Sequence, residues 1–176
     1  EIEADEYIIA TGAEPKSLAI PGIDKAIEAI DYLNNMDPKF RVAIIGGGLT
    51  GCEIAYELIL RGKRPVIIEA QDDILKLPSL NMANSSFLRD AFRYYETPIY
   101  LNAKVIGIKN DKVVIKQGET LTEIPAQQTV LSIGYTSYTE LLPEKPEKNI
   151  HTLGDCTKVG NLKHVIRAAY DLGIKL

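Results

Sequence analysis

Short apolar runs, some of them closed by glycine, set the pattern of the first half of the chain. Residues 41–45 read Arg-Val-Ala-Ile-Ile and stop at three glycines, while residues 65–69 read Pro-Val-Ile-Ile-Glu. Continuous apolar runs of this length are typical of strands buried on both faces of a sheet. Between them, apolar residues recur at three- and four-residue spacing from Leu49 to Leu60, which predicts a helix ending at Gly62.

The pattern changes its period in the second half of the chain. A second helix is expected over residues 84–95, then a short strand over 99–101. Three short runs joined by turn-forming residues predict an antiparallel meander, at 105–109, 112–117 and 121–124. Further strands are expected over residues 128–133 and 150–153, with a helix from about residue 161. The first 35 residues are interpreted as one short strand, residues 7–10, followed by a loop.

The composition excludes several classes of function. Acidic residues outnumber basic ones 24 to 20, so nucleic acid is not the expected main partner. Hydrophobic residues make up 45% of the chain, as in a globular protein, but no apolar run reaches the roughly 18 residues of a membrane helix. The two cysteines imply no disulfide framework, and we expect a reducing, cytoplasmic location without a membrane partner.

A glycine-rich turn joins the first strand to the first helix and satisfies the pattern G-x-G-x-x-G. Glu69 closes the next strand at the distance expected of a dinucleotide-binding unit. The first glycine permits a tight turn, the second lets the backbone approach a pyrophosphate, and the third lets the helix lie close to the strand. The helix N-terminus then attracts the phosphates. We therefore predict an NAD site that includes Gly46, Gly47, Gly48, Leu49, Thr50 and Gly51.

Glu69 also bears on the choice of cofactor. Its carboxylate is placed to accept the ribose hydroxyls of an adenosine, and it would repel the 2′-phosphate of NADPH. The residues that follow it include no cation before Lys76. The sequence therefore predicts NADH rather than NADPH as the preferred cofactor.

Four motifs in this order resemble those of the pyridine nucleotide–flavin oxidoreductases, in which an NAD domain is inserted into an FAD domain. Residues 10–15 are similar to the first crossover loop of that family, and residues 46–53 to its NAD fingerprint with a trailing glutamate. Residues 132–135 resemble the second crossover loop, and 153–155 the motif whose aspartate holds the ribityl chain of FAD. The resemblance implies that Gly134 contacts NAD and that FAD is contacted by Thr11, Gly12, Gly154 and Asp155.

The resemblance also implies a domain arrangement. We expect an α/β fold in which residues 37–139 form a Rossmann-like NAD(H)-binding domain with a parallel sheet and a three-stranded antiparallel meander. Residues 1–36 and 140–176 would then be parts of an FAD-binding domain. After Gly134-Tyr135 the family usually continues with a basic residue, proline and asparagine, whereas this chain continues Thr136-Ser137-Tyr138. The conformation of that loop is therefore not predicted.

Three segments, residues 46–58, 154–156 and 160–162, are similar to the C-terminal region of 2-enoate and 2,4-dienoyl-CoA reductases, which are related to old yellow enzyme. That similarity implies a parent protein with upstream FAD and FMN domains and a 4Fe–4S cluster, in which electrons pass from NADH through FAD to an activated C=C bond. The chain has no initiator Met and ends within a helical pattern, so we expect a fragment. Without the upstream half of the flavin site, it is expected to bind little FAD and to be inactive alone.

Few side chains are candidates for direct chemistry, because hydride transfer requires alignment more than acid–base help. Glu53 is the one candidate, because the resemblance implies that it lies near the nicotinamide. Cys52 and Cys156 lie far apart in the sequence and are expected to have no redox or metal role, and the two histidines have no partner at the spacing of a zinc site. Asp72 and Asp73 are interpreted as solvated charge, and no metal site is predicted.

Two other functions remain open on the sequence alone. The chain could belong to an NADH oxidase or a ferredoxin-reductase-like flavoprotein, in which case no FMN barrel or cysteine cluster would precede it. It could also be a nucleotide-binding module without turnover.

Overall fold

The computed structural model describes residues 3–76, 81–143 and 149–176, which form two compact units. Ser17–Gly134 make up the first, here called the central unit. The second, called the terminal unit, combines Glu1–Lys16 with Tyr135–Leu176. The central unit thus starts well before the domain boundary predicted at residue 37, and it ends at Gly134 rather than at 139.

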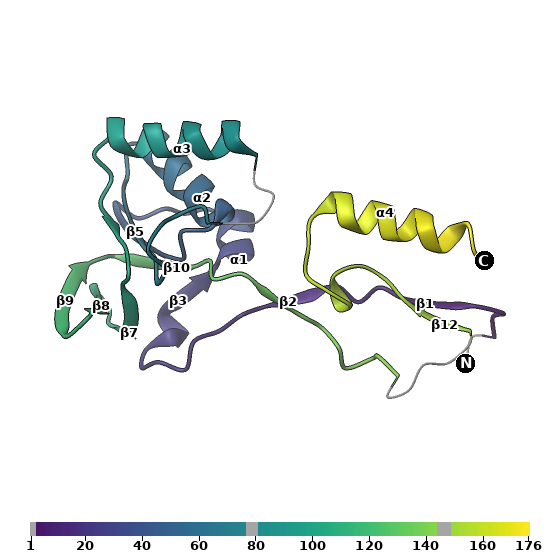
Figure 1. The fold of residues 1–176 in the computed structure, drawn as a ribbon. Helices are drawn as coiled ribbons and strands as arrows, with labels where there is room; N and C mark the ends of the chain where they lie inside the picture. Colours follow the sequence, from purple (N-terminus) through teal and green to yellow (C-terminus); the bar gives the residue numbers. More distant parts are fainter. Residues whose placement is uncertain (1–2, 77–80, 144–148) are drawn as a thin grey trace. The chain divides into compact units, whose positions relative to one another are not determined.

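A five-stranded sheet in the order β3-β10-β4-β5-β6 forms the middle of the central unit. Every neighbouring pair in it is parallel. Its strands span Ala26–Glu28 (β3), Gln128–Leu131 (β10), Arg41–Ile45 (β4), Arg64–Ile68 (β5) and Ile99–Tyr100 (β6). The strand β10 comes last of these five in the chain, yet it lies between the first two, β3 and β4. Figure 1 shows β10 beside β3.

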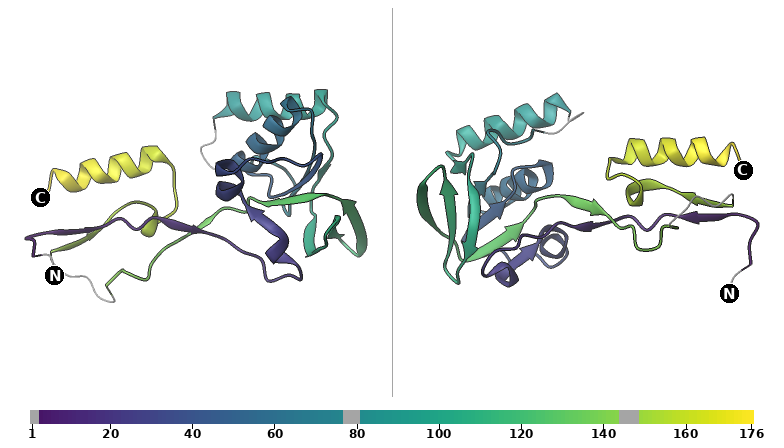
Figure 2. Two further views of the ribbon diagram at one scale, coloured as in Figure 1. Left: turned by 180° about the vertical axis from the view of Figure 1, so that it is seen from behind. Right: turned by 60° about the horizontal axis from the view of Figure 1, so that its bottom comes forward.

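Alternate residues of the sheet strands pack into two different layers. On one face, Ile44 and Ile67 join a core with residues of α1 (Ala29–Asn34), α2 (Leu49–Leu60) and α3 (Met82–Tyr94). On the other face, Ala43 and Val66 pack against the three-stranded antiparallel meander of β7, β8 and β9. Figure 2 shows the meander and the helices on opposite sides of the sheet. The meander strands span Lys104–Ile108, Lys112–Gln117 and Thr120–Pro125. The predicted α/β fold with a parallel sheet and an antiparallel meander is confirmed.

The first helix of the strand–helix–strand unit has the bounds that its pattern predicted, Leu49–Leu60. Gly62 follows it with a φ of 69°, the left-handed conformation that glycine adopts after a helix. Five of the helix residues are buried, including Cys52, Ala55 and Leu58, because the sheet lies beneath one of its faces.

The interpretation of residues 11–35 as loop is wrong. They contain strand β2 (Ala13–Pro15), a short 3-10 helix (Ile23–Lys25), strand β3 and helix α1. The carboxylate of Glu28 accepts a hydrogen bond from the Ile30 N–H and so caps α1. Because β3 pairs with β10, the later part of this stretch belongs to the same sheet as the glycine-rich turn, which explains the early start of the central unit.

Two small strand pairs and one helix make up the terminal unit. Strand β1 (Tyr7–Ile9) is parallel to β12 (Ile150–Thr152), and β2 is antiparallel to β11 (Tyr135–Ser137). Helix α4 (Leu162–Gly173) begins after Asn161, whose side chain accepts from the His164 N–H. None of the helices in the described part of the chain has the length and apolar composition needed to cross a membrane.

Candidate nucleotide site

The carboxyl ends of β4, β5 and β10 meet at one edge of the sheet. The chain leaves β4 for β5 on one side and only later returns as β10 on the other side. Such a reversal of strand order is where ligands bind in open α/β sheets, just beyond the strand ends. Gly46 follows β4 there, Glu69 follows β5, and residues 132–134 follow β10.

Two glycines of the turn are required by close backbone packing. A Cβ at Gly46 would lie 2.1 Å from the Ser132 carbonyl oxygen, and the residue has a φ of 106°. A Cβ at Gly51 would lie 2.1 Å from the Gly46 carbonyl oxygen. Any larger residue at either position would push apart the turn, the start of α2 or the loop after β10. The fingerprint glycines therefore bring α2 close to the strand end, as predicted.

Gly48 has a different environment, because a Cβ built there would meet no atom within 4 Å. It is the N-cap residue of α2 and offers no side chain to cover the first turn. The opening N–H groups of a helix have no partner within the helix, and the helix dipole makes this end positive. Gly48, half-buried Leu49 and exposed Thr50 therefore surround a position where an anion can reach backbone donors.

Glu69 is buried against the glycine-rich turn, with only 8% of its surface exposed. Its Oε2 accepts a hydrogen bond of 2.6 Å from the Gly47 N–H, and its Oε1 one of 2.8 Å from the Gln71 N–H. A carboxylate has about four acceptor positions, so two such bonds leave capacity for a ribose hydroxyl. The structure thus gives Glu69 a role that the sequence did not reveal, which is to hold the Gly47 peptide.

Cys52 lies directly beneath the turn and is fully buried. Its thiol donates to the Gly47 carbonyl oxygen at 3.4 Å. Burial raises the pKa of this thiol to about 12, so it stays protonated and is a packing group at neutral pH. The neighbouring Glu53 is exposed on the first turns of α2.

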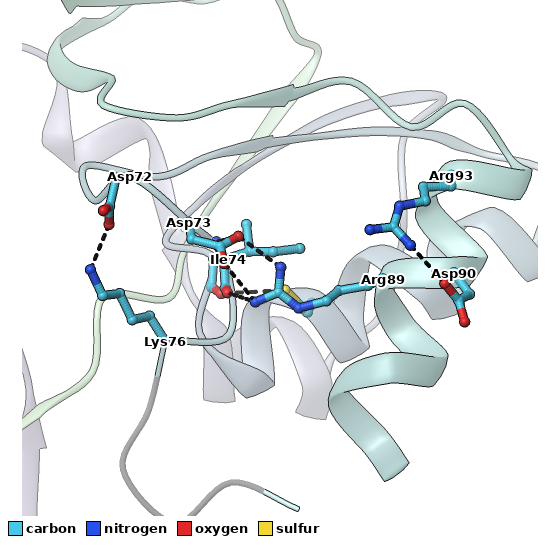
Figure 3. A network of polar contacts seen from close by, with 9 residues as sticks. Asp72, Asp73, Ile74, Lys76, Arg89, Asp90 and Arg93 are labelled. Carbon is cyan, nitrogen blue, oxygen red and sulfur yellow. Dashed lines mark hydrogen bonds and ion pairs between the residues drawn. The ribbon is translucent and has the colours of Figure 1, made fainter. Parts of the chain in front are cut away.

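An ion pair between Asp73 and Arg89 borders the same loop, and sequence analysis missed it. The Arg89 guanidinium donates to both carboxylate oxygens of Asp73, at 2.7 and 2.9 Å (Figure 3). The Arg89 hydrogen bond lowers the pKa of Asp73. Asp73 is therefore partly exposed charge held in an ion pair, and Asp72 lies in a more exposed ion pair with Lys76. No local pattern connects Asp73 with Arg89 in the sequence.

The residues assigned to FAD lie together in the terminal unit. Because β1 and β12 are parallel neighbours, Thr11 and Gly12 follow one strand end while Gly154 and Asp155 follow the other. The Thr11 hydroxyl donates to the Tyr138 carbonyl oxygen at 3.1 Å, and the Asp155 carboxylate accepts from the Gly160 N–H at 3.1 Å. All four residues are half-buried. Gly134, assigned to NAD, is exposed at the end of the central unit, with a φ of 90°.

No three His, Cys, Asp or Glu side chains among the described residues are grouped so that they could hold a metal ion. Both cysteines are buried free thiols. His151 lies in β12, with its Nε2 2.8 Å from a carboxylate oxygen of Glu6.

Comparison with known proteins agrees with this geometry. The chain is 35% identical to cinnamate reductase of Clostridium sporogenes over 98% of its length, and it spans 26% of that relative. It is 31% identical to a probable ferredoxin reductase of Castellaniella defragrans, over 80% of this chain and 37% of the relative. A solved 2-naphthoyl-CoA reductase has the same fold over 98% of this chain and 27% of its own, with a TM-score of 0.84 and 24% identity. The sequence pattern of one family matches residues 1–152, and the chain belongs to that family, the pyridine nucleotide-disulphide oxidoreductases.

Proposed function

We propose that the chain is the NADH-binding module of a flavin-dependent oxidoreductase, which delivers hydride from NADH to FAD. The observation that carries the proposal is the open, uncapped start of α2 at Gly48, placed at the switch point of the parallel sheet. Membership of the family supports a pyridine nucleotide and FAD as the two cofactors.

Each candidate residue then has a defined task. The N–H groups around Gly48 and the first turn of α2 bind the pyrophosphate, and Glu69 binds the adenosine ribose. Glu53 lies further along α2 and would contact the nicotinamide end, while Gly134 lines the loop after β10. The nicotinamide supplies a hydride to the flavin, so the protein has to orient the two rings and exclude water.

NADH is proposed over NADPH because of Glu69. A carboxylate at the ribose repels a 2′-phosphate, and Asp72 and Asp73 follow it in the same loop. Arg89 and Lys76 are cations beside that loop, and they already pair with Asp73 and Asp72. Tighter binding of NADPH than of NADH in parallel titrations would contradict this assignment.

The terminal unit is proposed to hold part of an FAD site through Thr11, Gly12, Gly154 and Asp155. The apolar face of α4 supports a site that is completed by other residues, because Leu162, Ile166, Tyr170 and Ile174 are between 60% and 73% exposed. We therefore expect the purified chain to show little flavin absorbance and no turnover. Stoichiometric flavin in the purified chain would contradict this expectation.

The acceptor of the electrons is proposed to be an activated C=C bond, since the chain resembles a cinnamate reductase over nearly all of its length. In that case the parent protein would carry upstream FAD and FMN domains with a 4Fe–4S cluster. The similarity to a probable ferredoxin reductase favours a second candidate, in which the acceptor is an iron–sulfur protein. Assaying the full-length parent with NADH and either a 2-enoate or a ferredoxin separates the two candidates. If the parent showed no NADH-dependent dye reduction, both candidates would fail and the chain would be a nucleotide-binding module without turnover.

The binding site is tested by the substitution Gly48→Ala. Its φ of −69° suits alanine and the new methyl group meets no protein atom, so the fold should melt at an unchanged temperature. The methyl group would occupy the approach of the pyrophosphate, and we expect the Kd for NADH to rise about tenfold or more. Gly173→Ala near the end of α4 is the matched control, since a Cβ there also meets nothing. Equal NADH affinity in both variants would contradict the proposed site.

A further inference from the structure

We propose that Arg89 is a positioning residue of the nucleotide site, which sets the affinity for the dinucleotide by fixing the Gly47–Gly48 peptide through the segment Asp73–Leu75. The inference rests on the proposed NADH site and extends it to a helix that does not border the strand ends. The segment Asp73–Leu75 is called the strap below.

Arg89 holds the strap at two successive residues. Its guanidinium makes the two bonds to the Asp73 carboxylate and a third, of 2.6 Å, to the Ile74 carbonyl oxygen (Figure 3). Only the planar fork of arginine satisfies a carboxylate and a carbonyl in this way, because a lysine ammonium presents a single point charge. The side chain of Arg89 is 31% exposed and that of Asp73 is 47% exposed, so salt screens their attraction. The geometry of the three bonds therefore contributes more to holding the strap than the charge of Arg89 does.

The strap in turn holds the glycine-rich turn. The Leu75 N–H donates to the Gly47 carbonyl oxygen at 2.7 Å, and a Cβ at Gly47 would lie 2.7 Å from Cγ2 of buried Ile74. Leu75 has a φ of 55°, a conformation that is costly for leucine and persists only when its surroundings impose it. The Arg89 bond to the preceding residue is one such constraint.

The orientation of the Gly47–Gly48 peptide decides where one backbone donor points. In a planar trans peptide the C=O and the N–H point in opposite directions. The Gly47 C=O is directed at Leu75 N–H and the Cys52 thiol, so the Gly48 N–H is directed away from them. On the other side of Gly47, its own N–H is fixed by Glu69. Loss of the strap would free this peptide to rotate and would misalign a donor for the pyrophosphate.

The experiment compares Arg89→Gln, Arg89→Lys and the control Arg93→Gln. Arg93 lies one turn further along α3, is 77% exposed and pairs with Asp90. We expect the Kd for NADH to rise about tenfold in Arg89→Gln and by at least about threefold in Arg89→Lys, with no change in the control. Competition against NADH by ADP should weaken in parallel with NADH, whereas competition by adenosine should change little. A general loss of stability would weaken both competitors alike and would contradict the inference.

The rate at which Cys52 is labelled reports whether the strap is held in place, and it can be measured without any nucleotide. This thiol is buried beneath Gly47, so its native-state reaction with a thiol reagent, located by peptide mass spectrometry, should accelerate in Arg89→Gln but not in Arg93→Gln. Unchanged labelling, or NADH affinity equal to that of the unaltered chain in both Arg89 variants, would overturn the positioning role of Arg89. The proposed function would not be affected by either result. Failure of the unaltered chain to bind NADH would instead overturn the proposed function and the affinity effect with it.

Discussion

Two helices of twelve residues, α2 and α4, show how differently the two units are built. In α2 five residues are buried between the sheet and α3. No residue of α4, all of which the structure describes, is buried, although its apolar residues recur every four positions along one face. An amphipathic pattern therefore identifies the face that needs a partner, but only packing shows whether the partner is there.

The same difference separates the two candidate sites. The nucleotide site stands on a sheet covered on both faces, so its turn is fixed by contacts within the central unit. The residues assigned to FAD follow two strands of three residues each. The roles proposed at the nucleotide site can therefore be argued from contacts of individual residues, whereas the flavin assignment rests on the family.

The largest expected effect is in the core of the central unit. Ile67→Ala empties a fully buried position between the sheet and the helices, and such truncations cost about 2–5 kcal/mol. Urea unfolding followed by circular dichroism measures the loss. A cost below about 1 kcal/mol would show that the sheet is not packed as described.

The same glycine-to-alanine change should have opposite effects in the two helices. In Gly51→Ala the new methyl group meets the Gly46 carbonyl oxygen, and overpacking of this kind costs about 1–3 kcal/mol. In Gly173→Ala the methyl group meets nothing, and alanine favours the helix by up to about 1 kcal/mol. Melting temperatures of the two variants would test the contrast, which fails if both shift in the same direction.

Alkaline pH should weaken the central unit through Cys52. Its pKa is raised from 9.0 to about 12, so the unfolded chain loses this proton at a lower pH than the folded one. The contribution of this thiol to the free energy of unfolding is complete below pH 9. Above pH 9 it falls by about 1.4 kcal/mol per pH unit, until the folded thiol also ionises. Unfolding free energies at pH 8.5 and 10.5 for the chain and for Cys52→Ala should show a shallower fall in the variant. Parallel slopes would contradict the burial of the thiol.

The smallest effect is expected in α4. Ile166→Ala removes a side chain that is 60% exposed, so the free energy of unfolding should change by less than about 0.5 kcal/mol. The measurement is the same as for Ile67→Ala, and the two variants form a matched pair. A cost similar to that of Ile67→Ala would mean that this face of α4 is covered in the protein.

The elements that sequence analysis predicted well are those with a strong local pattern. The glycine-rich turn, α2 and the meander depend on spacing and turn residues within a few positions, and the structure has them at or within two residues of the predicted bounds. Strand β3 was missed because it has three residues and gains its place only by pairing with β10, far away in the sequence. Helix α1 has only six residues and is capped by Glu28, which is not among the usual N-cap residues.

The sequence predicted where the candidate site residues lie in the fold, but not the contacts that support them. Spacing alone identified Gly46, Gly51 and Glu69, because each follows a strand end or begins a helix. The bonds from Glu69 to the turn and from Arg89 to Asp73 depend on side chains meeting across a loop, which no periodicity encodes.

The position of β10 between β3 and β4 has a consequence for how the chain is made. A ribosome adds about 5–20 residues per second, so several seconds pass between the synthesis of β4 and that of β10. During that interval the facing edges of β3 and β4 have no strand to pair with. The nascent chain therefore carries open hydrogen-bonding edges until Leu131 has emerged, and edges of this kind can pair with other chains.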